Sequence, residues 1–560
     1  MGANAAIYFH EEGYRTDQPK LMGRHAAGEG FLRGFLEHAE VDSLVAYAEN
    51  EQQFRIFEEI CGRSGARNAR LPRHWAGPGR EAALAEAGTL MLPGPGIAEY
   101  AWRRRRGDPR AYAICGVTHT TASQRVMDSF GELLTGPVEP WDAVICTSQA
   151  VRQTIELVLE RWAAWLEKRL GASRFVRPML PVIPLGVDCA AFAAPAAERA
   201  AARRRWREKL GIAADDLVVL FVGRLSWHAK AHPLPMYLGL EQAAKRAGLT
   251  RGARRLHLIE AGWHANDWIR DGFREGQQLA PSVRCHTVDG REAAARREIW
   301  HVADLFCSLS DNIQETYGLT PVEAMAAGLP VIGTDWDGYR DTLVHGETAL
   351  LVPTTLPEPS SGRIFAERHE DGRDSYDHYC GQTSLVTGVD VAAVTEALTV
   401  LLGEPGRRAA MGEAGRRRAL ALFDWKVVVG RYQELWAEQA ALRAAAPAEP
   451  RAPDEPVHPL RDNPFVLFGH YPTRTLGPQS RLRAVATPPA NPERLASLRM
   501  SRLDGRSPNP SPLSWKVLEA VRAAGPRGIA HADLVAAFPA TEGDAVAHAV
   551  GWLLKLGLIA

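Results

Sequence analysis

The sequence predicts an α/β protein with two doubly wound domains, each a parallel sheet with helices on both faces. Short apolar runs alternate with longer helical patterns from the start of the chain to about residue 440, an order typical of parallel sheets. Many of these runs are almost continuously apolar, as is typical of strands buried on both faces. At 560 residues the chain has room for about three to four domains of roughly 150 residues each.

The expected strands form two series, with a domain boundary near Asp188–Arg203. The first series is Ala5–Phe9, Ser43–Ala48, Thr89–Leu92, Tyr112–Val117, Asp142–Thr147 and Leu180–Pro184. The second series is Leu217–Val222, Leu256–Glu260, Val283–Val288, Leu305–Leu309, Pro330–Thr334 and Thr348–Val352. Helical periodicity is expected at Phe31–His38, Val389–Leu402, Gly406–Phe423 and Trp425–Arg443, with a polar surface insertion at 353–388. We therefore expect Rossmann-like domains at 1–190 and 191–424, followed by a helix at 425–445.

The remaining residues divide into a connector and a small helical module. Residues 446–512 contain 14 of the 37 prolines, a density that predicts an extended linker. Within it, Phe465–Tyr471 is apolar enough that we expect it to dock on a folded domain. Residues 513–560 regain helical patterns and resemble a winged-helix module without its wing. The expected helices of this module are Leu513–Ala523, His531–Phe538 and Asp544–Leu556.

Composition and charge exclude several classes of protein. Hydrophobic residues are 46% and charged residues 24%, close to globular averages, so wholesale disorder is excluded. Lys+Arg and Asp+Glu are both 66, and a neutral chain has no global field to hold polyanions. No run approaches ~18 apolar residues and the start lacks a signal peptide pattern, so neither a membrane span nor secretion is expected. The seven scattered cysteines predict reduced thiols in a cytoplasmic protein.

The densest chemical signal is the run from Ser310 to Asp335, Ser-Asp-Asn-Ile-Gln-Glu-Thr-Tyr-Gly-Leu-Thr-Pro-Val-Glu-Ala-Met-Ala-Ala-Gly-Leu-Pro-Val-Ile-Gly-Thr-Asp. A strand ends, a polar loop follows, and a helix begins with Thr320 as the expected N-cap. Gly318 lets the backbone approach a ligand closely, and the free N–H groups of a helix start suit a phosphate. The run also lies beyond the carboxyl end of a strand, where open α/β sheets bind ligands. An alternative is that Thr320 and Glu323 form a capping box, which explains neither Glu315 nor Gly318.

A second motif opens the second domain. The strand Leu217–Val222 runs into Gly223-Arg224-Leu-Ser-Trp-His-Ala-Lys230, so a glycine and two cations follow the end of a strand. The plain alternative is a strand end with solvated basic residues.

Together these runs resemble the group 1, family 4 retaining glycosyltransferases, which have the GT-B fold and a Glu-x7-Glu signature. The signature pair here is Glu315 and Glu323. The run Glu-Ala-Met-Ala-Ala-Gly-Leu-Pro-Val and the stretch that begins Asp335-Trp-Asp-Gly also match the family. The resemblance covers roughly residues 1–443, is strongest from Val219 to Pro353, and implies that the helix near Trp425–Arg443 packs back across the first domain.

The resemblance implies a role for each motif residue. Glu323 binds the nucleotide ribose, Glu315 contacts the donor sugar, and the backbone at Gly318, Leu319 and Thr320 receives the diphosphate. After the strand that ends at Gly223, Arg224 and Lys230 stabilise the charge that grows on the departing nucleoside diphosphate. One departure is that an extra residue precedes Lys230 and Ala231 replaces the family's glycine.

The first domain carries fewer marks. His119 follows the expected strand Tyr112–Val117, and the family often places a histidine there near the donor sugar. The segment Ile183–Asp188 resembles the family's domain junction. A glycine loop before the helix Phe31–His38, with Gly23 and Arg24, is expected to face donor phosphate and acceptor.

No metal or other cofactor is expected. Asp335-Trp-Asp337 has the Asp-x-Asp pattern of metal-dependent glycosyltransferases, but it lies inside a match to a metal-independent family. The basic runs Arg103–Arg106, Arg203–Arg205 and Arg416–Arg418 are expected to be solvated, with at most peripheral membrane contact.

The sequence therefore predicts a retaining, hexosyltransferase-like glycosyltransferase that uses a nucleotide-sugar donor and an unidentified acceptor. The alternatives are a catalytically idle GT-B scaffold, a regulatory protein with a partner-binding tail, and an epimerase or phosphorylase of the same fold. Residues 511–560 hold four basic and four acidic side chains, so we expect this tail to bind a protein partner and not DNA.

Overall fold

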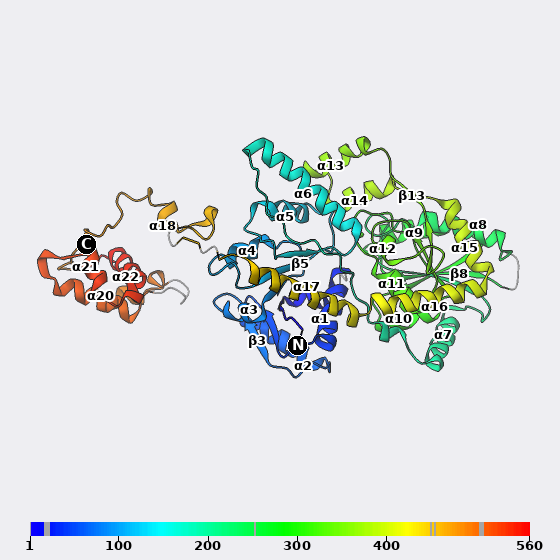
Figure 1. The fold of residues 1–560 in the computed structure, drawn as a ribbon, viewed down its shortest axis with the longest axis horizontal. Coiled ribbons are helices and arrows are strands. Elements are labelled where there is room, and N and C mark those ends of the chain that lie inside the picture. The colour runs from blue at the N-terminus through cyan, green and yellow to red at the C-terminus, as the bar shows by residue number, and fades with distance from the viewer. Residues whose placement is uncertain (1, 16–22, 251–253, 449–450, 453–454, 503–508) are drawn as a thin grey trace. The chain divides into compact units, whose positions relative to one another are not determined.

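The computed structural model describes residues 2–15, 23–250, 254–448, 451–452, 455–502 and 509–560. The chain divides into two compact units, Met1–Val457 and His458–Ala560, and each is described by itself (Figure 1). Within the described residues, no helix is both long enough and apolar enough to cross a membrane.

The first unit contains two six-stranded parallel sheets with the same winding. One sheet has the order β3-β2-β1-β4-β5-β6 and the other β12-β11-β10-β7-β8-β9. In the first sheet the strands are β1 (Ala6–Tyr8), β2 (Leu44–Tyr47), β3 (Arg73–Ala76), β4 (Thr89–Met91), β5 (Ala113–Val117) and β6 (Ala143–Ile145). In the second they are β7 (Leu217–Val222), β8 (Leu256–Gly262), β9 (Val283–Asp289), β10 (Leu305–Ser308), β11 (Val331–Thr334) and β12 (Ala349–Val352). The strand order reverses between β1 and β4 and between β7 and β10, and ligands bind outside the carboxyl ends at such reversals.

Helices cover both faces of each sheet, and a buried apolar cluster lies against each face. The first half has α1 (Gly23–His38), α2 (Glu51–Arg63), α3 (Ala82–Ala87), α4 (Ala98–Arg104), α5 (Gln124–Thr135) and α6 (Gln149–Leu170). The second half has α7 (Ala196–Leu210), α8 (Leu234–Arg246), α9 (Asp267–Gln277), α10 (Ala293–Glu298), α11 (Leu319–Ala326), α12 (Tyr339–Thr342), α15 (Val391–Gly403) and α16 (Pro405–Leu422). The predicted fold of two doubly wound halves is confirmed.

The helix α17 (Trp425–Ala445) packs on α1 of the first half (Figure 1). Its Trp425 ring is surrounded by glycines: a Cβ at Gly30, Gly34 or Gly186 would lie 3.1, 2.7 or 2.3 Å from it. A predicted glycine loop before Phe31 is therefore wrong, because α1 begins at Gly23. The glycines that suggested a loop are helical residues that make room for an aromatic ring.

Two further strand predictions differ from the structure. Residues 180–184 form no strand, although Val182 makes an isolated bridge to Cys146. The edge strand β3 is missing from the predicted series, because Arg73 and His74 interrupt any apolar run and Ala76 alone is buried. Edge strands are covered on fewer sides, so they lack the continuous apolar pattern of central ones.

The predicted surface insertion is a helical hairpin. The paired strands β13 (Thr354–Thr355) and β14 (Gly388–Val389) form its neck. Beyond the neck lie α13 (Arg363–Glu370) and α14 (Tyr376–Leu385), which project from the second sheet toward the first half (Figure 1).

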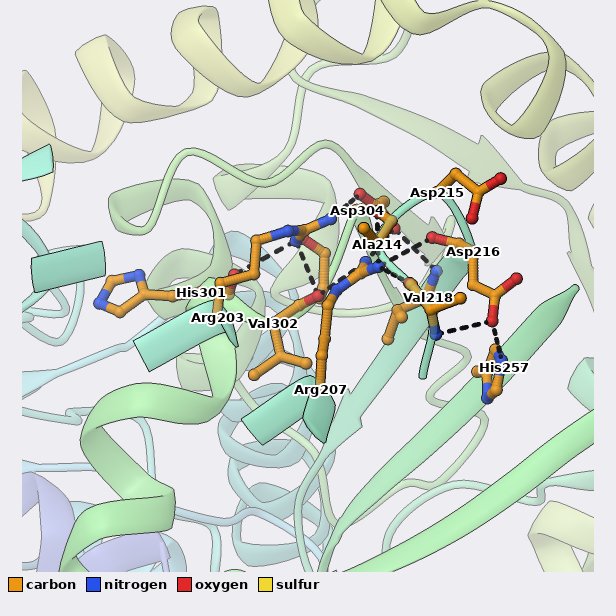
Figure 2. A network of polar contacts seen from close by, with 12 residues as sticks. Arg203, Arg207, Ala214, Asp215, Asp216, Val218, His257, His301, Val302 and Asp304 are labelled. Carbon is orange, nitrogen blue, oxygen red and sulfur yellow. Dashed lines mark hydrogen bonds and ion pairs between the residues drawn. The ribbon is translucent and has the colours of Figure 1, made fainter. Parts of the chain in front are cut away.

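A buried polar network joins α7 to the amino-terminal ends of strands in the second sheet (Figure 2). Arg207 donates to the Asp304 carboxylate at 3.1 Å, and this carboxylate also accepts from a backbone N–H of β7 at 2.8 Å. Nearby, His257 Nε2 contacts the Asp216 carboxylate at 3.0 Å and its Nδ1 contacts His286 Nε2 at 2.9 Å. Burial lowers the pKa of both imidazoles, so both are neutral at pH 7.

The C-terminal unit has an earlier start than the predicted helical module. Its helices are α18 (Pro464–Leu467), α19 (Pro492–Ser497), α20 (Pro512–Ala523), α21 (His531–Ala536) and α22 (Gly543–Lys555). The strand β15 (Arg481–Leu482), inside the predicted linker, pairs with β16 (Ile529–Ala530), and Ala484 bridges Ile559. The module is therefore not all-helical, and the predicted linker 446–512 supplies one of its strands. Within this unit Phe465 and Tyr471 are exposed, so docking of this segment is not seen there.

Candidate functional site

The polar loop after β10 brings Glu315 and Lys230 together. Glu315 Oε2 accepts a hydrogen bond from Lys230 Nζ. Its Oε1 accepts from the backbone N–H of Gly318 at 3.1 Å and of Thr316 at 3.3 Å. Burial alone raises the pKa of Glu315, but the Lys230 ammonium and these N–H groups outweigh it, so the net pKa lies below its ordinary value. Glu315 is therefore a carboxylate fixed in one orientation.

The helix α11 begins differently from the prediction. Gly318 is the N-cap, with φ of 91° and no side-chain cap, and a Cβ there would lie 2.3 Å from the Tyr339 ring. Only glycine fits this backbone and this contact. The predicted N-cap at Thr320 and the alternative capping box with Glu323 are both wrong, because Thr320 lies in the first turn and the Thr320 hydroxyl is buried without a hydrogen-bond partner.

Glu323 has no hydrogen bond or ion pair among the described residues. Burial raises the pKa of Glu323 to about 7, although Lys230 opposes the shift. A buried carboxyl that costs free energy to ionise, beside a free helix start and an unpartnered hydroxyl, is a feature of binding sites. Leu319 and Thr320 are the first residues of the helix, so their N–H groups are among those without an intrahelical partner.

The second motif lies beside this loop. Arg224 donates to the Ala229 carbonyl oxygen at 2.8 Å and to Gln314 Oε1 at 3.4 Å. Burial lowers the pKa of Arg224, although Asp377 opposes the shift. A Cβ at Gly223 would lie 3.7 Å from Lys230 Cε. The extra residue before Lys230 therefore does not keep its ammonium from the site.

The first half meets the donor loop through backbone and hydroxyl contacts. The His119 carbonyl oxygen accepts from the Thr316 hydroxyl at 3.2 Å, and the Thr147 hydroxyl donates to the Thr316 carbonyl oxygen at 3.3 Å. Ser148 donates to Asp337 at 3.3 Å. His119 also borders a cavity of about 360 Å³ in the first half, at the carboxyl ends of β4 and β5. The cavity wall is mostly apolar and includes Tyr14, Phe31, Met91, Leu92, Trp425 and Tyr432.

The two candidates near the chain start are not brought to the donor loop by any described contact. Gly23 is the first residue of α1 and is exposed. The side chain of Arg24 lies outside the described residues.

Two site residues were missed from the sequence. Asp337 has φ of 44°, and burial together with the Glu315 charge raises its pKa to about 8. Its signal was present, since it follows the carboxyl end of β11. Tyr376 of α14 contacts Thr120 across the two halves at 3.2 Å, and nothing in the sequence of the insertion pointed to it.

The Asp-x-Asp pattern does not form a joint site. Asp335 pairs with Arg340 at 3.2 Å, whereas Asp337 accepts from Ser148. Within the described ranges, no group of three or more His, Cys, Asp or Glu side chains has an arrangement that could hold a metal ion.

Two doubly wound halves whose strand ends meet through these contacts, with a final helix packed back on the first half, define the GT-B fold. Residues 216–361 match the family described as glycosyl transferases group 1. The second half of the unit is therefore a group 1 glycosyl transferase domain, as the Glu-x7-Glu resemblance predicted.

Named relatives agree with this family. A D-inositol 3-phosphate glycosyltransferase of Kineococcus radiotolerans is 30% identical over 289 residues, 48% of this chain and 54% of that protein. A phosphatidyl-myo-inositol mannosyltransferase of Mycobacterium leprae is 30% identical over 149 residues, 26% of this chain and 29% of that protein. The chain spans about half the length of the first of these relatives.

Among solved structures, Anabaena Alr3699/HepE in complex with UDP and glucose has 14% identity and a TM-score of 0.47. The match covers 78% of this chain and 100% of that chain. The fold assignment rests on the strand order, because a TM-score under 0.5 adds nothing to it.

Proposed function

We propose that this protein is a retaining glycosyltransferase that moves a sugar from a nucleotide-sugar donor to an acceptor. The observation that carries the proposal is the arrangement at the start of α11. A buried carboxyl with no partner among the described residues (Glu323), an unpartnered hydroxyl (Thr320) and a free helix start lie beside a fixed Glu315–Lys230 pair. Each of these groups is complementary to one part of a nucleoside diphosphate sugar.

The nucleotide end would occupy α11. Ribose hydroxyls would donate to the Glu323 carboxylate, which satisfies a group that is otherwise costly to bury. The diphosphate would accept from the free N–H groups at Leu319 and Thr320, where the helix dipole favours an anion.

The leaving group would be stabilised by cations already at the site. As the sugar–phosphate bond breaks, negative charge grows on the diphosphate, and Arg224 and Lys230 are held close to the donor loop by Gln314 and Glu315. Such pre-placed charges are worth most where water is excluded. We therefore propose that the reaction needs no divalent metal. The sugar would pass through an oxocarbenium-like state, and the acceptor would attack on the face that the leaving group left.

The acceptor would enter from the first half. The mostly apolar cavity beside His119 lies at the edge of the first sheet that meets the donor loop through Thr316. We propose that the acceptor places an apolar group there and presents a hydroxyl toward the donor sugar.

The donor is identified by thermal-shift screening with UDP, GDP, ADP and TDP, repeated with Glu323→Ala. One nucleotide should stabilise the native protein and lose most of its effect in the variant. Glu347→Ala is the matched control, because Glu347 is an exposed glutamate of the same half outside the donor loop. Stabilisation by none of the four nucleotides would contradict the donor site, and equal stabilisation of both proteins would remove Glu323 from it.

The role of Glu315 is tested by release of sugar from the identified donor. Glu315→Ala should lower turnover while the nucleotide-induced thermal shift remains. Unchanged turnover would exclude Glu315 from the reaction.

A further inference from the structure

The α13–α14 insertion is a folded hairpin with its own internal contacts. The neck pairs Thr355 with Gly388 in antiparallel register. Beyond it, Arg368 makes two hydrogen bonds of 2.8 Å to the Asp374 carboxylate, and His369 stacks on Tyr379 with ring centroids 4.8 Å apart. Two paired arginine N–H groups and a ring stack fix the two helices against each other. The insertion can therefore transmit a position and is not a slack surface loop.

One face of α14 packs on the loop that carries the two cations. Cys380, Gly381 and Ser384 are the buried residues of this helix. A Cβ at Gly381 would lie 2.9 Å from His228 Cβ, in the segment between Arg224 and Lys230. This approach places the hairpin directly against the donor side of the site.

The first residue of α14 reaches the other half of the molecule. The Tyr376 hydroxyl lies 3.2 Å from Thr120 Oγ1. Burial raises the pKa of Tyr376 well above its ordinary value, so the hydroxyl keeps its proton and can donate. Thr120 directly follows His119, the residue that borders both the donor loop and the apolar cavity.

The short segment 118–120 is thus held by two separate elements of the second half. The donor loop contacts it through Thr316 and the carbonyl oxygen of His119. The insertion contacts it through Tyr376 and Thr120. Two contacts on neighbouring residues fix both the position and the rotation of this segment relative to the donor loop.

We propose that the α13–α14 insertion is a latch between the two halves, with Tyr376 as the positioning residue that holds His119 and Thr120 against the donor loop. This inference rests on the proposed glycosyltransferase function and concerns the alignment of acceptor and donor, not nucleotide binding. Tyr376 makes no recorded contact with α11, so loss of its hydroxyl should leave the nucleotide site intact. The rate of sugar transfer should fall, because misplacement of reacting groups lowers the rate more than it lowers affinity.

Point variants test the latch with a split between kcat and KM. Tyr376→Phe and Thr120→Val should each lower kcat for transfer about three- to tenfold, the range expected for one hydrogen bond. The donor KM and the nucleotide-induced thermal shift should stay within twofold. The double variant should be no worse than either single variant, because both remove the same contact.

Two further variants serve as controls. Thr120→Ser keeps the hydroxyl and should restore kcat. Tyr379→Phe, on the same helix but stacked on His369, should not change kcat. An unchanged kcat in Tyr376→Phe, additive losses in the double variant, or an equal loss in Tyr379→Phe would each overturn the latch.

Removal of the hairpin gives the largest effect. Because Thr355 and Gly388 are paired, residues 356–387 can be replaced by a two-residue Asn-Gly turn. This variant should keep the nucleotide-induced thermal shift and lose most of its transfer activity. Full transfer activity would overturn the latch. If the deletion variant does not fold, the point variants decide. If the parent protein itself binds no nucleotide, the donor-site proposal has failed and not the latch.

Discussion

The second sheet of the first unit has buried polar clusters at both of its ends, and the two clusters are built differently. At the amino-terminal ends of the strands, Arg207, Asp304, Asp216 and His257 satisfy one another (Figure 2). At the carboxyl ends, Glu323 has no partner among the described residues and the Thr320 hydroxyl is unpaired.

The difference separates a polar cluster that stabilises the fold from one that can bind. A buried charge with its hydrogen bonds made has little left to offer a ligand, and its removal exposes its partner. A buried carboxyl or hydroxyl without a partner costs stability in the free protein and regains it when a ligand supplies donors. Burial of polar groups alone would not have distinguished the two ends.

The largest expected effect breaks the satisfied cluster. Asp304→Ala leaves the buried Arg207 guanidinium without its carboxylate, and should lower the free energy of unfolding by about 3–5 kcal/mol. The measurement is urea unfolding followed by tryptophan fluorescence. Asp271→Ala is the control, because its pair with Arg274 is exposed and should be worth less than about 1 kcal/mol. Equal destabilisation by the two variants would mean that the network carries no special stability.

A middle-sized effect sharpens the other end. Burial raises the pKa of Glu323 to about 7, above its unfolded value, so the folded state holds this proton more tightly between about pH 4.5 and 7. The stability that Glu323 contributes is therefore present at low pH and lost as pH rises through 7. Glu323→Gln should make the protein more stable than the parent at pH 8 and no more stable at pH 5.

The same titration should appear in binding with the opposite sign. Ribose hydroxyls donate to the carboxylate, so nucleotide affinity of the parent should rise from pH 6 to pH 8, and Glu323→Gln should abolish this rise and weaken binding at pH 8 about tenfold or more. Calorimetric titration at both pH values checks it. A pH-independent affinity in the parent would show that Glu323 does not touch the nucleotide.

The smallest effect concerns a single hydroxyl. Thr320→Val replaces an unpartnered buried hydroxyl with a methyl group, and should leave the free energy of unfolding unchanged or slightly higher. Nucleotide affinity should fall only about two- to fivefold. A loss of stability of about 1 kcal/mol or more would show that the hydroxyl is satisfied in the free protein.

The sequence predicts the fold well where packing is symmetrical. The strand Leu217–Val222 matches β7 because a central strand is apolar on both faces. It fails at α1, where Gly30 and Gly34 look like loop residues. Their helical state depends on Trp425, almost 400 residues away, and no local pattern contains that contact.

The candidate site divides in the same way. Glu315, Glu323 and Gly318 lie in one continuous run, so their grouping could be predicted from the sequence. Asp337 and Tyr376 reach the site only through contacts between elements, with Ser148 and Thr120 of the other half. An argument from spacing has no access to such contacts.

The C-terminal unit changes an electrostatic prediction. Residues 458–560 contain 12 basic and 7 acidic residues, a net charge of +5, whereas the shorter segment 511–560 is neutral. The added charge comes from the region of β15 and α19, which was predicted to be a linker. The helix α22 exposes Asp544, His548 and Lys555, a face of mixed charge. Net charge alone therefore no longer selects a protein partner for this unit.

The packing of Trp425 has a consequence for motion between the two halves of the first unit. The chain crosses between them near residue 187 and again near residue 424, and the two crossings are bridged to each other. Both covalent connections thus share one pivot, with Trp425 inserted beside it against Gly186. A rotation about this pivot leaves the covalent geometry undisturbed, so the freedom of the halves is angular and not translational. A side chain added at Gly186 would act as a stop on that rotation, at a distance from every group that touches a substrate.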